Sequence, residues 1–332
     1  MPGRVLLVLG LLTAGFAARA EPSAELVAAA RREGSVSFYA GFPNAALQAL
    51  TAKGFQEKYG VRVDVLQMRA SELNERVRTE QAAGRFIADV MQQGESSTTL
   101  HGEAGRLAPL GEIARAKDAD AARAVFADRA AGFVAPYAIL VNTNLVKPAD
   151  EPKSWLDLLD PRWKGRVLCD DPRAAGGGGA FLAATISIHG EDFHRRFATN
   201  APVFTRDPAV AERRVAAGEY PVLIPALVAS MPGLRGLPLK YLAPEEGVPS
   251  IRMDHSILKN APHPNAARLF IEFFLSPDFQ AEIGKLGLLP VVDGLAGRMP
   301  AELQPFARAR LLGGMRAESQ QRQLEFATTV YK

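Results

Sequence analysis

The sequence predicts an α/β protein with two domains. Short apolar strands alternate with helical segments between residues 26 and 91, and the alternation returns between residues 155 and 224. Alternation of this kind implies a parallel sheet whose strands are joined by right-handed crossovers. Two extended apolar segments, residues 132–144 and 251–258, have the length and placement of strands that pass from one domain to the other.

The beginning of the chain has the pattern of a cleaved signal peptide. Arg4 supplies a positive charge, residues 5–16 are apolar, and residues 18–20 form an A-x-A cleavage site. The apolar run is too short to span a bilayer. We therefore expect residues 1–20 to be removed and the mature chain, beginning at Glu21, to be exported.

The composition excludes several classes of protein. The formal charge is +3 over 332 residues, and no run of basic residues indicates a nucleic-acid partner. Cys169 is the single cysteine, so no disulfide forms within the chain, and its apolar neighbours favour an inert buried thiol over a nucleophile. An exported chain without disulfides suits the bacterial periplasm.

The first domain is predicted as three strands that alternate with helices. Val61, Val63 and Val65 alternate with polar residues as in a half-buried strand, and Gly60 ends the helix before them. The predicted elements are helix 26–32, strand 36–40, a helix ending at residue 59, strand 61–65, a helix from Ser71 to Gly84, and strand 88–91.

The carboxyl ends of these strands are the place where open parallel sheets bind ligands. They deliver Phe42, Arg69, Ser71, Ser96 and Ser97, each beside the start of a predicted helix. Helix N-termini attract anions, and an arginine can hold a carboxylate or phosphate with two hydrogen bonds. The alternatives are that the serines only cap helices, that the arginine is a surface charge, and that the phenylalanine belongs to the core.

The second domain is predicted from residue 155 onward. A short helix stops before Pro161, because the residue before a proline avoids the helical conformation. The predicted elements are helix 155–159, strand 167–169, helix 180–188, strand 202–206, helix 209–217 and strand 220–224, followed after the return segment by helices 264–275 and 277–285.

A glycine-rich turn joins the first strand and helix of that domain. Asp170, Asp171 and Pro172 follow the strand, and four glycines, residues 176–179, precede the helix. A strand, a polar turn, glycines and a helix N-terminus together can cradle an anion or another small ligand. The alternative is a flexible loop without a ligand, and the motif of a nucleotide P-loop is missing.

Several segments resemble one known family. They are YAILVNT at 137–143, PKSWLDLLDPRWKGR at 152–166, APHPNAA at 261–267, LSP at 275–277, and residues 69–73 with 88–90. Together they are similar to the ferric-type cluster of ABC-transporter solute-binding proteins. The resemblance covers nearly the whole mature chain, in order and with compatible spacing.

The resemblance implies a type II periplasmic binding protein. Two α/β lobes with mixed sheets would be joined by two crossing strands and hold a ligand in the cleft between them. Residues 21–136 with 256–332 would form lobe 1, and residues 137–255 lobe 2. Such a protein delivers its ligand to an inner-membrane ABC permease and is not an enzyme. We expect it to be a monomer.

The sequence departs from the iron-binding members at one place. Those members carry a tyrosine pair after a strand of the second lobe, whereas residues 225–227 here are Pro-Ala-Leu. Ferric iron requires anionic oxygen ligands. We therefore expect no metal or cofactor and a small anionic ligand, namely a phosphonate, sugar phosphate or carboxylate. Ferric iron, a periplasmic enzyme and a ligand-presenting sensor remain the alternatives.

The expected site combines residues from both lobes. Arg69, Arg173 and Arg206 would bind the anion with help from helix N-termini, while Phe42 and Tyr137 would cover an apolar part of the ligand. Core packing is the competing role for the two rings. The predicted ligand-binding residues are Phe42, Arg69, Ser71, Ser96, Ser97, Tyr137, Asp171, Arg173, Gly177, Gly178, Arg206 and Ala226.

An enzyme finds little support in the sequence. His189 and His194 lie five residues apart, a spacing that does not place them on one face of a helix. The hydrolase and metalloprotease motifs GxSxG and HExxH are missing from the 332 residues. A sensory role cannot be told from transport by sequence, but neighbouring permease and ATPase genes would separate the two.

Overall fold

The structure, a computed structural model, describes residues 20–117 and 124–332. The predicted signal peptide lies outside the described residues except for Ala20. Among the described residues, the strands are β1 (Ser35–Ala40), β2 (Arg62–Gln67), β3 (Val90–Gly94), β4 (Ala130–Asn142), β5 (Val167–Asp170), β6 (Val203–Thr205), β7 (Val222–Leu227), β8 (Leu239–Leu242), β9 (Val248–Ile257), β10 (Leu289–Pro290) and β11 (Leu311–Gly313). The helices are α1 (Ala24–Glu33), α2 (Ala45–Tyr59), α3 (Ala70–Ala82), α4 (Glu95–Glu103), α5 (Gly177–His189), α6 (Asp192–Thr199), α7 (Pro208–Ala216), α8 (Pro264–Phe274), α9 (Pro277–Lys285), α10 (Gln304–Arg308) and α11 (Ala317–Val330).

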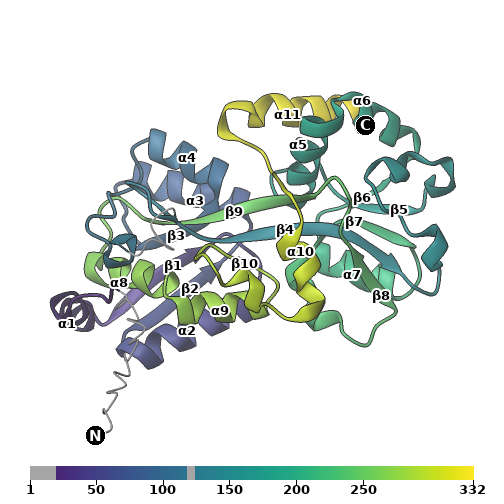
Figure 1. The fold of residues 1–332 in the computed structure, drawn as a ribbon. Helices are drawn as coiled ribbons and strands as arrows, with labels where there is room; N and C mark the ends of the chain where they lie inside the picture. The colour runs from purple at the N-terminus through teal and green to yellow at the C-terminus, as the bar shows by residue number, and fades with distance from the viewer. Residues whose placement is uncertain (1–19, 118–123) are drawn as a thin grey trace, which may run out of the picture.

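Two long antiparallel strands join the halves of the molecule. The main strand order is β2-β1-β3-β9-β4-β7-β5-β6, so β9 and β4 lie at its centre (Figure 1). The pairs of β1 with β2 and β3, and of β5 with β6 and β7, are parallel, whereas β3 with β9 and β4 with β7 are antiparallel. The predicted fold, two α/β lobes with mixed sheets joined by two crossing strands, is confirmed.

Local sequence signals set the ends of several helices. The Asn44 side chain accepts a hydrogen bond from the amide of Leu47 and so caps α2, and Gly60 ends that helix with a left-handed conformation at φ 72°. The predicted helix 155–159 is a 3₁₀ turn over Leu156–Leu159, cut short by Asp160 and Pro161.

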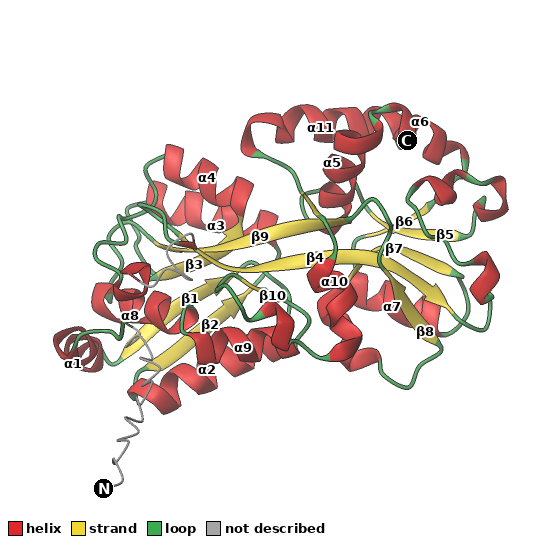
Figure 2. Ribbon diagram, viewed as in Figure 1, coloured by secondary structure: helices red, strands yellow, loops and turns green. Residues whose placement is uncertain are grey.

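Each lobe has its own aromatic core, and helices cover both faces of the sheet (Figure 2). The first core is centred on Phe38, Phe55 and Phe270, which lie between β1, α2 and α8. The second is centred on Trp155 and Phe181, whose ring centroids lie 5.1 Å apart. These separate cores make each lobe a compact unit.

The C-terminal helix returns to the second lobe. β11 pairs with β9 at Val248, and α11 then packs on α5 and α6 and reaches α4 of the first lobe (Figure 1). Ala327 and Tyr331 are buried in the second core. The sequence assigned residues 256–332 to lobe 1; because of this packing, we propose that α11 belongs with lobe 2.

Membrane insertion through a helix has no support in this part of the structure. Within residues 20–117 and 124–332, each helix is too short or too polar to cross a bilayer.

Candidate ligand site between the lobes

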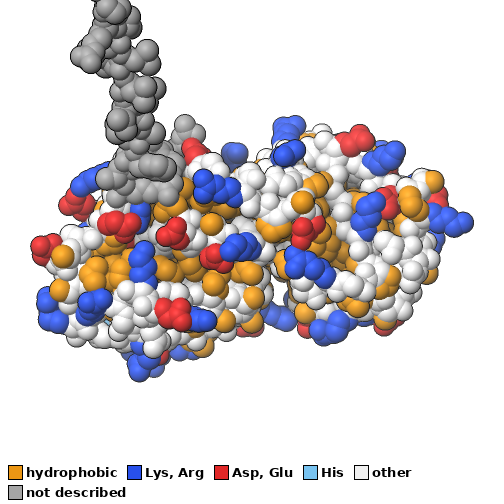
Figure 3. Space-filling model, turned by 60° about the horizontal axis from the view of Figure 1, so that its bottom comes forward, with side chains coloured by type: hydrophobic (Ala, Val, Ile, Leu, Met, Phe, Trp, Pro, Cys, Tyr) orange, Lys and Arg blue, Asp and Glu red, His pale blue; other side chains and the backbone are white. Residues whose placement is uncertain are grey.

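The strand ends of both lobes converge on the centre of the molecule. Gly41 follows β1 and donates its amide to the carbonyl of Gln92 in β3, and Tyr137 in β4 pairs with Leu227 at the end of β7. The molecular surface is hollowed where the two halves meet (Figure 3). The residues that surround this junction are therefore the candidates for ligand binding.

The glycine turn is packed tightly against the end of β5 and against β4. A Cβ atom at Gly177 would lie 2.7 Å from Cε1 of Tyr137, and one at Gly178 would lie 2.5 Å from the carbonyl oxygens of Asp170 and Asp171. Gly176 has φ 133°, a conformation that side chains disfavour. Close packing therefore requires glycine here, and it brings Tyr137, Gly177 and Gly178 together. That they bind a ligand stays a prediction.

Asp170 caps α5 and was not among the predicted ligand-binding residues. Its Oδ2 accepts a hydrogen bond of 2.7 Å from the amide of Gly178. Burial raises the pKa of Asp170 to about 6, although that bond opposes the shift. Burial, followed by the charge of Asp170, also raises the pKa of Tyr137. The available signal was an acidic residue at the end of the strand, six residues before the first of the glycines, because carboxylates favour helix N-termini.

Asp171, Arg173 and Arg206 form an ion-pair cluster beside the turn. Asp171 is buried, and it accepts from Nε of Arg173 at 2.8 Å and from Nε of Arg206 at 2.9 Å. Burial acts to raise the pKa of Asp171, but the bonds from both arginines outweigh it and lower the pKa below its ordinary value. Arg173 also donates to the carbonyl of Tyr331 at 3.0 Å, so it anchors the end of α11.

The predicted residues of the first lobe differ in their exposure. Arg69 and Ser71 are exposed at the start of α3, and within the described residues the Arg69 guanidinium has no ion-pair partner. Phe42 is buried and packs edge-on against Phe133 with ring centroids 5.2 Å apart. Ser96 donates to Oε1 of Gln320 in α11 at 2.8 Å. Arg69 and Ser71 are thus open to solvent, whereas the side chains of Phe42 and Ser96 already have partners.

Ser97 belongs to a buried polar network behind the cleft wall. Its hydroxyl accepts from Nδ2 of Asn74, whose Oδ1 accepts from Nε2 of Gln93 and from Nε2 of His101 at 3.0 Å each. Burial lowers the pKa of His101 to about 4, so its ring is neutral and carries its proton on Nε2. The network fixes α3, β3 and α4 relative to one another.

Ala226, one of the predicted ligand-binding residues, lies on β7. It is buried in β7 and pairs with Ala138 of β4. In the described part of the chain, no three histidine, cysteine, aspartate or glutamate residues are grouped closely enough to hold a metal ion. The polar groups at this junction are arginines, aspartate carboxylates, backbone amides and hydroxyls.

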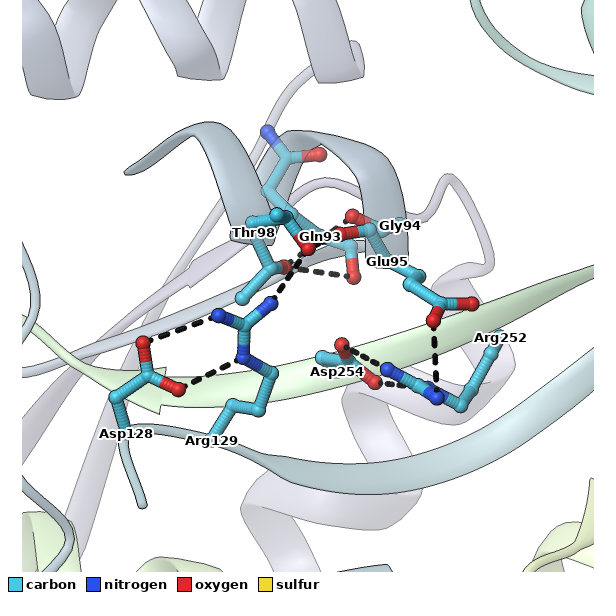
Figure 4. Close-up of polar contacts among 9 residues, drawn as sticks. Gln93, Gly94, Glu95, Thr98, Asp128, Arg129, Arg252 and Asp254 are labelled. Carbon is cyan, nitrogen blue, oxygen red and sulfur yellow. Dashed lines mark hydrogen bonds and ion pairs between the residues drawn. The ribbon is translucent and has the colours of Figure 1, made fainter. Parts of the chain in front are cut away.

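A second ion-pair cluster lies on the crossing strand β9, and its residues were not among those predicted to bind the ligand. Arg252 donates from Nε to Oδ1 of Asp254 at 2.7 Å, and its Nη1 lies 3.1 Å from Oε1 of Glu95 at the start of α4 (Figure 4). Beside it, Arg129 pairs with Asp128 and donates to Thr99 of α4. Alternation of polar residues along 250–256 was the signal available in the sequence.

Solved structures share this fold. The substrate-binding protein of an ABC transporter from Agrobacterium tumefaciens has a TM-score of 0.78 at 17% identity, over 90% of this chain and 94% of that one. Iron-bound HitA from Pseudomonas aeruginosa has a TM-score of 0.69 at 22% identity, over 89% and 99%. AfuA from Actinobacillus pleuropneumoniae with fructose-6-phosphate has a TM-score of 0.67 at 22% identity, over 88% and 97%. The TM-scores, at this coverage of both chains, show a common fold, that of type II periplasmic binding proteins.

A relative found by sequence comparison matches a smaller share of this chain than the solved structures do. An uncharacterized protein of Haemophilus influenzae is 32% identical over 161 residues, which is 46% of each chain. The match thus spans about half the length of that relative.

The family model of bacterial extracellular solute-binding proteins matches residues 41–281, which include the strands from β2 to β9, and so both crossing strands, together with the glycine turn. The chain belongs to the family of bacterial extracellular solute-binding proteins, whose members bind substrates and are not enzymes.

Proposed function

We propose that this protein captures a small anionic ligand between its lobes in the periplasm and delivers it to an inner-membrane ABC permease. A phosphonate, a sugar phosphate and a carboxylate are the ligand classes. The observation that carries the proposal is the first turn of α5, where the amides of Gly177 and Gly179 have no acceptor among the described residues. Free amides at a helix N-terminus favour an anion.

Two further features support an anionic ligand. Arg69 is exposed at the start of α3 and keeps an unpaired charge within the described residues. AfuA, a protein of the same fold, holds fructose-6-phosphate. HitA instead holds iron, so ferric iron is the second candidate. The residues Pro225, Ala226 and Leu227 disfavour it, because they offer no phenolate.

A thermal-shift screen tests the proposal directly. Phosphonates, sugar phosphates, carboxylates and ferric citrate are added to the mature protein, and one anion class should raise the melting temperature. A ligand at about a hundred times its dissociation constant adds roughly 2.7 kcal/mol of stability. A screen in which only ferric iron stabilises the protein would favour the iron alternative, and substrate turnover would favour an enzyme.

The role of Arg69 has its own test. Arg69→Ala should weaken the ligand found in the screen and leave the melting temperature of the empty protein unchanged, because the side chain is exposed. Arg62→Ala is the matched control, since Arg62 is also exposed and pairs only with Asp64 on β2. A lower melting temperature with unchanged affinity would make Arg69 a structural residue.

A further inference from the structure

Arg252 stands where the two lobes are joined. It lies on β9 opposite Val134 of β4, within the two-stranded ribbon that crosses between the lobes. Its guanidinium contacts Glu95, and the next residue, Ser96, is hydrogen-bonded to Gln320 of α11. The arginine therefore lies at a junction of the crossing strand, a helix of the first lobe and the C-terminal helix.

The two edges of the Arg252 guanidinium have different surroundings. Nε and Nη2 donate to the carboxylate of Asp254 at 2.7 and 3.0 Å, and the Asp254 side chain is 0% exposed. The face of the guanidinium lies over the ring of Phe126, 4.9 Å from its centroid. Because a buried carboxylate and an aromatic ring hold the group from two sides, its orientation is fixed before any ligand arrives.

Within residues 20–117 and 124–332, Glu95 alone pairs with the outer edge of the guanidinium. Nη1 of Arg252 lies 3.1 Å from Oε1 of Glu95, whose side chain is 53% exposed, while that of Arg252 is 26% exposed. Ion pairs with an exposed partner are weak, because water solvates the carboxylate nearly as well as the arginine does. Another anion can therefore replace Glu95 at little cost, whereas it cannot replace Asp254.

We propose that Arg252 is an anion-binding residue of this protein, and that Glu95 occupies its outer edge until an anionic group of the ligand takes that place. The inference rests on the proposed capture of an anionic ligand, and it adds a residue of the crossing strand β9 that contacts the anionic group. Glu95 then acts as an internal competitor, since its carboxylate must move aside before the ligand contacts Nη1.

The test measures binding of methylphosphonate, glucose 6-phosphate and succinate by titration calorimetry. Removing Arg252 alone would leave Asp254 as an unpaired buried charge, so the variant R252Q/D254N removes both charges together. This variant should bind the probe that the wild type binds about ten to a hundred times more weakly, as expected for the loss of a charge-assisted contact. E95Q should bind that probe about two to five times more tightly, because the competitor is gone.

Arg129→Gln is the matched control, since Arg129 forms a neighbouring arginine–carboxylate pair with Asp128. Its affinity for the probe should equal that of the wild type. Wild-type affinity in R252Q/D254N would overturn the role of Arg252 while the proposed function stands. Weaker binding in E95Q would overturn the displacement, because Glu95 would then contact the ligand. Failure of all three probes to bind the wild type would overturn both.

Discussion

At the scale of single residues, burial and close packing decide which predicted side chains are available to a ligand. Arg173 and Arg206 were expected in the site, but both pair with the buried carboxylate of Asp171. The sequence places Arg173 two residues after Asp171 and Arg206 at the end of another predicted strand, but it does not show whether these groups face each other or a ligand. The sequence is equally silent on Phe42, because a ring beside a strand end can pack into the core or face a ligand. In the structure the ring is buried.

The pH dependence of stability reports on Asp170. Its pKa is about 6 in the folded protein and 3.8 in an ordinary setting, so the unfolded chain releases this proton first. The contribution of Asp170 to the free energy of unfolding therefore falls as the pH rises from about 4 to about 6. Asp170→Asn should have a higher unfolding free energy than the wild type at pH 7, by at most about 3 kcal/mol. Urea unfolding of both proteins at pH 4 and pH 7 measures this difference, which should shrink at pH 4. Equal stability at both values would contradict the raised pKa.

The glycines of the turn should tolerate no side chain. Gly177→Ala places a methyl group 2.7 Å from the Tyr137 ring and 2.8 Å from Oδ2 of Asp170, and we expect a loss of about 1–3 kcal/mol in unfolding free energy. Gly233→Ala is the control, because a Cβ there has open space around it. Denaturant midpoints of the two variants measure the effect. A stable Gly177→Ala protein would show that the turn is looser than its contacts indicate.

At the scale of elements, the sequence predicts the type of an element, strand or helix, more accurately than its first and last residues. The predicted strand 36–40 is β1, Ser35–Ala40, but the predicted helix 180–188 begins three residues earlier, at Gly177. Glycine is a poor helix former, and the carboxylate of Asp170 offsets this by accepting the amide of Gly178. The position of α11 could not be predicted, because its anchors, such as His194, lie more than a hundred residues away in the sequence.

The hydrogen bond between α4 and α11 should favour closure of the lobes. Gln320→Ala removes the acceptor of the Ser96 hydroxyl, and the arrangement with α11 against α4 then loses about 0.5–1.5 kcal/mol. We expect the ligand found in the screen to bind about two to ten times more weakly, because a smaller fraction of the protein is in the binding arrangement. Titration calorimetry measures the affinity, and small-angle scattering the size of the empty protein.

The matched control for this variant lies on the same helix. Gln321 donates to Glu325 within α11, and both side chains are exposed. Gln321→Ala should leave affinity and scattering unchanged. If Gln320→Ala also leaves both unchanged, the bond between the helices contributes nothing to closure.

At the scale of the whole molecule, the fold follows from the sequence and the ligand does not. Two stretches of alternating strands and helices, with one long extended segment between them and another after the second, suffice for the architecture, because crossover connections allow few arrangements of such elements. The ligand depends on a few side chains at the junction, and proteins of the same fold hold either iron or a sugar phosphate.

The lack of a tyrosine at residues 225–227 leads to a prediction about the colour of the protein with iron. The purified protein should stay colourless when ferric citrate is added, because Pro225, Ala226 and Leu227 provide no phenolate for charge transfer to iron. Absorption spectra before and after addition measure this directly. A red complex would contradict the expectation and point to Tyr137, the tyrosine beside the glycine turn, as a ligand.

The return of α11 to the second lobe also governs how the protein folds. The Tyr331 hydroxyl is hydrogen-bonded to Nδ1 of His194, 137 residues earlier in the sequence. Helices α8 and α9, which belong to the first lobe, lie between these two residues in the chain. The second core is therefore completed by a segment that follows α8 and α9 of the first lobe in the chain. Long-range closure of this kind slows folding. It also ties the two lobes to one another, so that denaturant should unfold them in a single cooperative transition rather than one after the other.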